Sequence, residues 1–204
     1  MKKYNRLLVL LLAVLLLSAV LTGCDEKETA PSVRAEDHSD ARVLVVYFSY
    51  TGHLDRMAHW IADETSGDIV RVTAKEPYPD DYDKTVDRAK QEHDDETRPE
   101  IEIDLTQEQL AEYDTVFFGF PVWWYDLPMP MWTFLESYDF TGKTIIPFIS
   151  HEGTSNGGSA FKSMKALVPG VDIRSDDDLS IRGEKVENSE QDVRSWVKGL
   201  GYSK

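Results

Sequence analysis

The sequence predicts an α/β domain built as a doubly wound parallel sheet of five strands with helices on both faces. Nearly continuous β-branched and aromatic runs at 42–48, 115–120 and 143–150 are typical of strands buried on both faces. Segments with apolar residues at helical spacing lie between these runs. Strands that alternate with helices in this way favour a parallel sheet covered by helices.

The remaining elements follow from local patterns. Further strands are predicted at 68–73, where alternation indicates a sheet edge, and within 171–181, as one strand or two short pieces. Helices are predicted at 53–65, 82–94, 130–138, 158–167 and 188–200, with a short helical or turn segment at 105–113. Pro147 is unusual inside a strand, because proline cannot donate to a ladder hydrogen bond.

Composition limits the possible functions. The chain has 204 residues, of which 41% are hydrophobic and 29% charged, so it fits one soluble domain beyond its leader. Its formal net charge of −15 repels nucleic acid phosphates, which excludes nucleic acid as a partner. The charge suits either a cationic partner or solubility alone. The single cysteine, Cys24, excludes a disulfide within the chain and a cluster of thiolate metal ligands.

Residues 1–24 are interpreted as a lipoprotein signal peptide. Three basic residues precede an apolar run at 7–21, and Leu21-Thr22-Gly23-Cys24 resembles the bacterial lipobox. That resemblance implies a diacylated Cys24 as the new N-terminus, which would hold the protein at the extracytoplasmic face of the cell membrane. The alternative is an ordinary secretory signal. Polar residues 25–40 are predicted to form a flexible tether to a domain at 41–204. Without the three basic residues of the leader, the net charge becomes −18.

Ligands on such a sheet bind beyond the carboxyl ends of the strands, which directs attention to three loops. The first loop contains Ser49, Tyr50, Thr51, Gly52, His53 and Leu54. It leads from a buried strand into a helix N-terminus, where free backbone N–H groups attract an anion such as a phosphate. The alternative is a plain capped turn between strand and helix.

The second and third loops are candidates to hold a ring. The second loop contains Pro121, Val122, Trp123 and Trp124, followed by Tyr125. The third loop begins with Ser150, His151, Glu152 and Gly153 and is rich in glycine and hydroxyl groups as far as Ser159. Three successive aromatic residues suggest stacking on a planar ligand, or else a cover over the sheet edge. The third loop either wraps the edge of that ligand or is an ordinary surface loop.

From about Arg42 to Tyr202 the chain resembles the flavodoxin-like family. The stretches that carry the resemblance are YFSYTGHLDRMA, GFPVWWYDLPMPMWTFLESYDFTGKTIIPFISHEGTSNGGS and IRGEKVENSEQDVRSWVKGLGY. It implies the flavodoxin-like fold and FMN as cofactor, with the phosphate in the first loop and the isoalloxazine ring between the second and third loops. Ser49, Thr51 and Gly52 match the family's phosphate loop, and the quoted residues of the other two loops match its flavin-edge loops.

Two departures from the family pattern bear on FMN. The family usually has Asn-Thr where this chain has His53-Leu54. Losing one hydroxyl contact costs about 1 kcal/mol or somewhat more, and so weakens binding roughly tenfold. A protonated His53 facing the phosphate would compensate and make FMN bind more tightly below about pH 6.5, whereas an exposed histidine at the helix start would not. Tyr125-Asp126 replaces a commonly small residue and narrows access to the flavin.

Three functions fit this reading. The first is an FMN electron carrier that serves a redox partner at the outer face of the membrane. The second is an FMN-dependent NAD(P)H or quinone oxidoreductase, and the third is a flavin-free binding module on the same fold. No glycine fingerprint of a second nucleotide domain is present, which favours the first. Electron transfer requires no catalytic side chain, and the five histidines show no spacing typical of metal ligands.

Overall fold

The computed structural model describes residues 36–153 and 156–204, so the predicted signal peptide, Cys24 and most of the tether lie outside the described residues. The strands are β1 (Val43–Tyr47), β2 (Asp68–Arg71), β3 (Thr73–Ala74), β4 (Ile101–Glu102), β5 (Thr115–Pro121), β6 (Thr144–His151), β7 (Asp172–Ile173) and β8 (Leu179–Arg182). The helices are α2 (His53–Thr65), α3 (Tyr82–Asp94), α4 (Gln107–Ala111), α5 (Met129–Ser137), α6 (Gly158–Leu167), α7 (Gly183–Val186) and α8 (Glu190–Gly199).

The main sheet confirms the predicted doubly wound parallel fold. Its order is β2-β1-β5-β6-β7, with β8 also beside β6, and every pairing is parallel. The predicted edge strand, β2, does lie at an edge. The fifth position is shared by two short strands, β7 and β8, so the second alternative for 171–181 holds.

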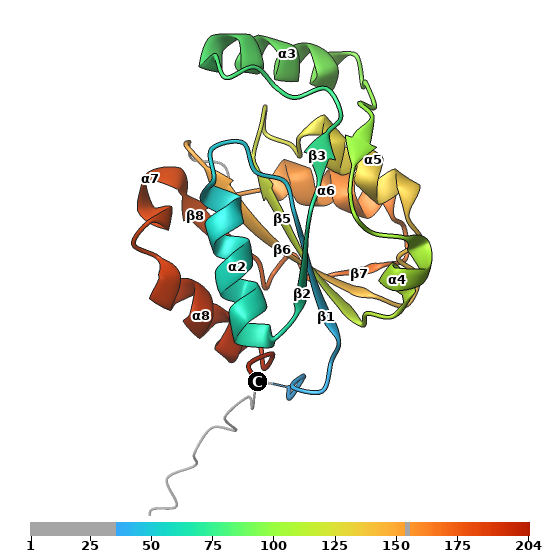
Figure 1. Cartoon of the computed structure of the whole chain (residues 1–204), viewed down its shortest axis with the longest axis vertical. Helices are drawn as coiled ribbons and strands as arrows, with labels where there is room; N and C mark the ends of the chain where they lie inside the picture. The colour runs from blue at the N-terminus through green and yellow to red at the C-terminus, as the bar shows by residue number, and fades with distance from the viewer. Residues whose placement is uncertain (1–35, 154–155) are drawn as a thin grey trace, which may run out of the picture. The chain divides into compact units, whose positions relative to one another are not determined.

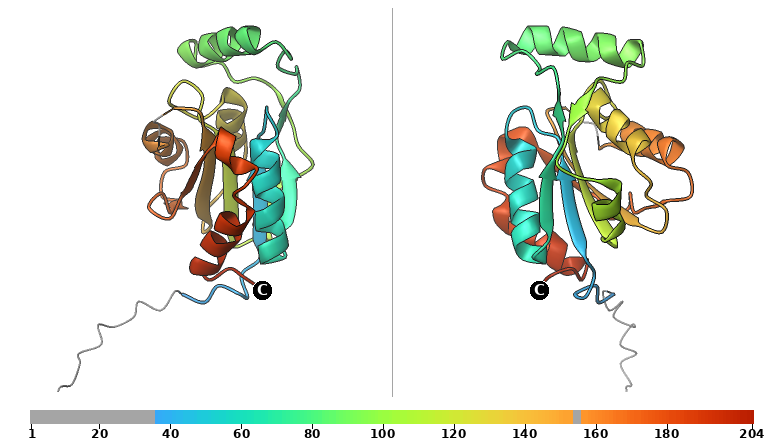
Figure 2. Two further views of the ribbon diagram at one scale, coloured as in Figure 1. Left: turned by 90° about the vertical axis from the view of Figure 1, so that its left-hand side faces the viewer. Right: turned by 45° about the vertical axis from the view of Figure 1, so that its right-hand side comes forward.

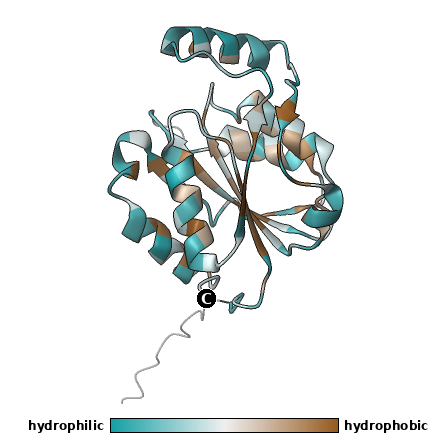
Figure 3. Cartoon of the chain, in the orientation of Figure 1, coloured by the Kyte–Doolittle hydropathy of each residue, from teal (hydrophilic) through white to brown (hydrophobic). Residues whose placement is uncertain are grey.

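Apolar side chains leave the central strands on both faces of the sheet. In β1, Val43, Val45 and Tyr47 pack with α2 and α8, whereas Leu44 and Val46 pack with α4, α5 and α6. Figures 1 and 2 show the sheet between these two helical layers. Apolar residues accordingly concentrate in the central strands, and polar residues cover the outer helices (Figure 3). The alternation along each strand thus requires helices on both sides.

Pro147 fits β6 because of the division between β7 and β8. The Ile145 carbonyl accepts a hydrogen bond from Arg174 N–H on the β7 side of the strand, so Pro147, two residues on, faces the same side. On that side β7 pairs with residues 144–145 and β8 with residues 148–151. Pro147 lies in the gap between these pairings, where no partner requires its missing N–H.

Strands β3 and β4 and helix α7 were not predicted. The two strands form a small antiparallel pair that carries α3 beyond the carboxyl ends of the main strands (Figure 1). Each strand has only two residues, and α7 has only four, so these segments are too short to show a periodic pattern.

Among the helices of residues 36–153 and 156–204, none has the length and apolar character of a membrane-spanning segment.

The end of the predicted tether contacts the domain. The His38 ring stacks on the Tyr202 ring at 4.6 Å, and the His38 N–H donates to the Gly201 carbonyl at 2.9 Å. Contacts with the domain therefore begin before residue 41, and the chain enters the domain at the amino ends of the parallel strands.

Gly119 allows β5 and β6 to pack closely. A Cβ atom at this position would lie 2.2–2.8 Å from atoms of the Phe148 ring, which is fully buried. We expect Gly119→Ala to lower the free energy of unfolding by about 1–3 kcal/mol, because an overpacked core must shift. Urea unfolding measures this change. Gly199→Ala is the matched control, since a Cβ there meets no atom within 4 Å, and an equal effect of the two substitutions would contradict the packing argument.

Candidate functional site

The first loop leads from β1 into α2 and leaves the start of the helix uncapped. Gly52 is the N-cap residue, with a left-handed φ of 89°, and no side chain caps the helix. Such a φ favours glycine. The buried Ser49 hydroxyl oxygen accepts a hydrogen bond from Gly52 N–H at 3.1 Å, which fixes the turn. The amides of the first helical turn therefore remain available to an anion outside the helix.

The other side chains of this loop point in different directions. Thr51 is exposed beside the uncapped turn. Leu54 is buried in the core, so only its backbone remains near the turn. The Tyr50 hydroxyl donates to the Pro79 carbonyl at 2.7 Å, which directs this ring toward the α3 side of the loop.

The start of α2 is also tied to the end of β1. The Tyr47 hydroxyl donates to Asp55 Oδ1 at 2.5 Å, from the last residue of the strand to the first turn of the helix. Burial, followed by the hydrogen bond to the Asp55 carboxylate and its negative charge, raises the pKa of Tyr47 well above its ordinary value. Tyr47 therefore stays protonated and continues to donate at physiological pH.

The second loop is a tight hairpin with two aromatic residues at its tip. Trp123 and Asp126 exchange two backbone hydrogen bonds, each of 2.9 Å. Between them, Trp124 and Tyr125 have φ angles of 49° and 68°. Two-residue hairpins need positive φ at such positions and usually place Asn or Gly there. Bulky residues in this conformation are strained by about 1–3 kcal/mol each.

Anchors at both ends hold this hairpin. The Val122 N–H donates to the Ser150 carbonyl at 2.8 Å, which joins the second loop to the start of the third. The buried Asp126 carboxylate accepts from Leu127 N–H at 2.7 Å and from the Ser163 hydroxyl of α6 at 2.6 Å. The aromatic tip is thus fastened to the helix that follows the third loop.

The third loop meets the first beside α7. His151 Nδ1 lies 2.7 Å from the Gly153 carbonyl oxygen, within the loop. The place where a Cβ would stand on buried Gly183 is 2.0 Å from Glu152 Oε1 and 2.7 Å from His53 Nδ1. Any side chain at residue 183 would therefore push these two groups away. The absence of a side chain brings a carboxylate and an imidazole together beside the uncapped helix start.

The structure brings all three predicted loops to one edge of the sheet. His53 and Glu152 join the first and third loops, the Val122–Ser150 hydrogen bond joins the second and third, and an edge-to-face contact of 6.0 Å between Tyr50 and Trp123 joins the first and second. Across residues 36–153 and 156–204, no group of three or more His, Cys, Asp or Glu side chains is arranged to hold a metal ion.

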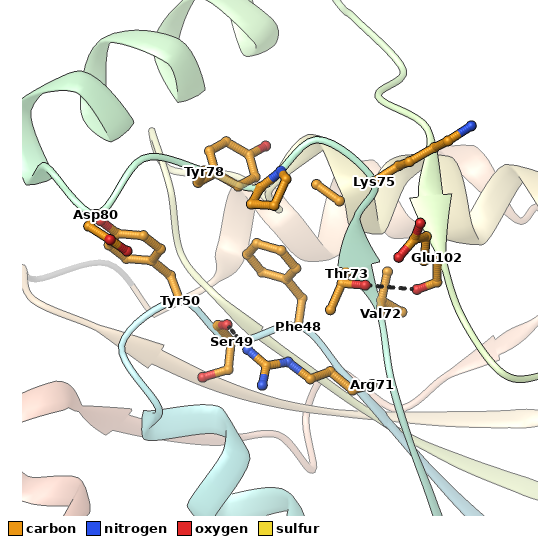
Figure 4. Close-up of a pocket in the computed structure, with 12 residues that line it drawn as sticks. Phe48, Ser49, Tyr50, Arg71, Val72, Thr73, Lys75, Tyr78, Asp80 and Glu102 are labelled. Atoms are coloured by element: carbon orange, nitrogen blue, oxygen red, sulfur yellow. Dashed lines mark hydrogen bonds between the residues drawn. The ribbon is translucent and has the colours of Figure 1, made fainter.

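Sequence reasoning did not identify Arg71, at the end of β2. Its guanidinium donates to the Ser49 carbonyl at 2.8 Å and borders a cavity of about 420 Å³ beside the first loop. Figure 4 shows this cavity, in which the Phe48 ring is directed toward Tyr78 and Glu102 lies beside Thr73. An arginine at the carboxyl end of the strand beside β1 was the available signal, since parallel neighbours end at the same edge.

Comparisons with known proteins agree with this architecture. A family model described as Flavodoxin matches residues 42–200. A candidate flavoprotein from Bacteroides uniformis is 33% identical, with a TM-score of 0.66, and the match covers 78% of this chain and 98% of that protein. A second one, from Bacteroides eggerthii, is 28% identical with a TM-score of 0.65 and the same coverage. A Lactobacillus acidophilus flavoprotein solved in complex with FMN is 23% identical over 72% of this chain and 97% of its own, with a TM-score of 0.57.

The identity to the Lactobacillus protein supports a common fold alone, whereas the family match rests on the sequence itself. The matched segment contains every strand of the main sheet and all three loops at its carboxyl edge. The resemblance found in the sequence is therefore confirmed, and this chain belongs to the flavodoxin family.

Proposed function

We propose that this protein binds FMN across the three loops and transfers electrons at the extracytoplasmic face of the membrane. The observation that carries the proposal is the uncapped start of α2 at Gly52, set beside two further loops at the same edge of the sheet. Bound FMN supplies reversible uptake and release of electrons. The protein's own residues bind the cofactor, orient it and set its electrostatic surroundings.

Neutral donors suit the phosphate end. The first-turn amides of α2 point out of the helix, and the Ser49 and Thr51 hydroxyls border the same turn. Aligned peptide dipoles add a partial positive charge there. Such a site binds a dianion without a cluster of basic side chains, which fits a chain with a formal net charge of −15.

A fixed aromatic wall suits the ring end. The Trp123 ring has edge-to-face contacts with Phe48, Tyr50 and Tyr78, with centroid distances of 5.5, 6.0 and 5.0 Å. These contacts hold Trp123 in one orientation before any ligand arrives, and preorganisation of this kind lowers the entropic cost of binding. The third loop, from Ser150 to Gly153, supplies the opposite side. The match to the flavodoxin family over residues 42–200 supports the same assignment of cofactor.

The lipobox-like sequence before Cys24 supports the membrane location. The chain enters the domain beside Tyr202, at the edge of the sheet where the strands begin, whereas the three loops lie at the other edge. A protein anchored through Cys24 can thus present its cofactor edge away from the bilayer. An electron-transfer partner then approaches from the extracytoplasmic side.

The Thr51 hydroxyl gives a direct test of FMN binding. We expect the full chain to take up FMN with a yellow absorption band, and Thr51→Val to weaken binding about 10- to 100-fold, because a hydrogen bond to a charged phosphate is worth about 1.5–3 kcal/mol. Titration monitored by quenching of FMN fluorescence gives both dissociation constants. The control is Thr141→Val at the opposite edge, which should leave the affinity unchanged. A chain that takes up no FMN would refute the proposed cofactor.

The acidic domain also sets an electrostatic bias on the bound cofactor. Negative surroundings oppose the arrival of electrons, so we expect the reduction potential of bound FMN to lie below that of free FMN. Salt screens exposed charges, and the difference should therefore be larger at low ionic strength. Potentiometric titration at two salt concentrations measures both effects. A potential above that of free FMN would contradict this expectation.

A further inference from the structure

A second, smaller cavity of about 280 Å³ lies between α3 and the hairpin of the second loop. Four aromatic side chains border it, namely Tyr50, Tyr82, Trp123 and Trp124. Its remaining lining comes mainly from one face of α3, where Thr85, Val86 and Ala89 follow Tyr82 at helical spacing. The least polar stripe of an otherwise polar helix thus faces a hollow surrounded by rings.

Hydrogen bonds and a cation–π contact hold the walls of this cavity in place. The Trp124 indole N–H donates to the Val86 carbonyl at 3.3 Å, and Lys90 Nζ lies 5.4 Å from the centre of the Trp124 ring. Within α3, Arg88 binds the Glu92 carboxylate at 2.7 Å and donates to the Pro77 carbonyl at 3.0 Å. The helix is therefore fixed to the preceding turn and bridged to the hairpin, so both walls are positioned by contacts within the protein.

Exposure and strain coincide at this place. In the part of the chain that the structure describes, the large hydrophobic side chains that stay exposed are Tyr82 at 66%, Trp124 at 40% and Tyr125 at 73%. Two of them line the cavity, and the third is the neighbour of Trp124 in the strained turn. Residues held in such backbone conformations cluster at ligand sites, where surrounding contacts impose them.

We propose that this cavity binds a small, flat, uncharged aromatic compound that carries a hydroxyl or amino group. Its volume, at the lower end of the range for ligand pockets, suits one or two fused rings. Flat ligands match a lining of aromatic faces and edges, because stacked and edge-to-face contacts both favour them.

The polar groups determine the rest of the ligand. The Tyr50 and Thr85 hydroxyls each donate to the Pro79 carbonyl at 2.7 Å, so each can only accept a hydrogen bond from a ligand. The residues that line the cavity are all uncharged, so an anion would find no cationic partner among them, and Lys90 beside the Trp124 ring is already paired with Asp94. A neutral ligand with its own donor, as in a phenol or an aromatic amine, satisfies these constraints.

The cavity adjoins the three-loop site and lies on its α3 side. It shares Tyr50, Val122, Trp123 and Trp124 with the first and second loops. Neither Thr51–Leu54 nor any described residue of the third loop lines it. The inference therefore does not depend on the proposed phosphate position, and competition with FMN separates the two sites.

The test is calorimetric titration of the full chain in detergent with 2-naphthol. We expect saturable binding at one site, at least threefold weaker binding of 2-methoxynaphthalene, which cannot donate, and at least tenfold weaker binding of anionic 2-naphthoate. Ala89→Phe fills the cavity and should weaken 2-naphthol binding at least tenfold. Ala111→Phe, on the exposed end of α4, is the matched control and should change nothing. Tyr82→Ser removes an exposed ring, so it should spare the fold and weaken binding severalfold.

Unsaturable binding of 2-naphthol, or equal binding by Ala89→Phe and the unmodified chain, would overturn the proposal. If Ala89→Phe does not fold, as judged by circular dichroism, unchanged affinity in Tyr82→Ser overturns it instead. Displacement of 2-naphthol by FMN would assign the cavity to the flavin site and also overturn it. A chain that binds 2-naphthol but not FMN would refute the proposed cofactor alone.

Discussion

Burial of β1, β5 and β6 on both faces is the constraint on which the rest of the structure depends. Apolar side chains leave these strands alternately to both sides, so helices must cover both faces of the sheet. The loops that connect strands to helices therefore lie at the amino and carboxyl ends of the strands. Polar backbone groups without partners then remain where strands end and helices begin. The uncapped start of α2 at Gly52 is such a place, and the second and third loops flank it because β5 and β6 follow β1 in the sheet.

Local patterns predicted the long elements, because a strand such as β5 or a helix such as α2 repeats its apolar period several times. They predicted the loop positions as well, since the ends of parallel strands share an edge. Contacts that depend on distant segments were out of reach. Nothing near residue 183 in the sequence indicates that it must lack a side chain, and nothing at Tyr50 indicates that its ring turns toward α3. The strained conformation of Trp124 and Tyr125 also contradicts local preference, so only tertiary contacts explain it.

The chain is acidic overall, but the groups at its candidate phosphate position are neutral hydrogen-bond donors. Over the whole chain acidic residues outnumber basic ones, 37 to 22, yet the candidate phosphate position is formed by amides and hydroxyls, with Arg71 directed at the Ser49 carbonyl. Peptide groups fixed by a helix need no reorganisation when an anion arrives, whereas flexible basic side chains lose rotamer freedom. An acidic surface can therefore coexist with an anion site.

The position of α3 gives the hairpin of the second loop a second neighbour. Crossover connections of doubly wound sheets normally return along a face, but here β3 and β4 carry α3 past the carboxyl ends of the strands (Figure 1). The hairpin of the second loop consequently has two sides, one toward the third loop and one toward α3. Trp123 contacts Phe48, Tyr50 and Tyr78 and forms part of both. A ring bound against α3 and a flavin bound on the other side would be separated by little more than this indole, so the rigidity of Trp123 would fix the geometry of both.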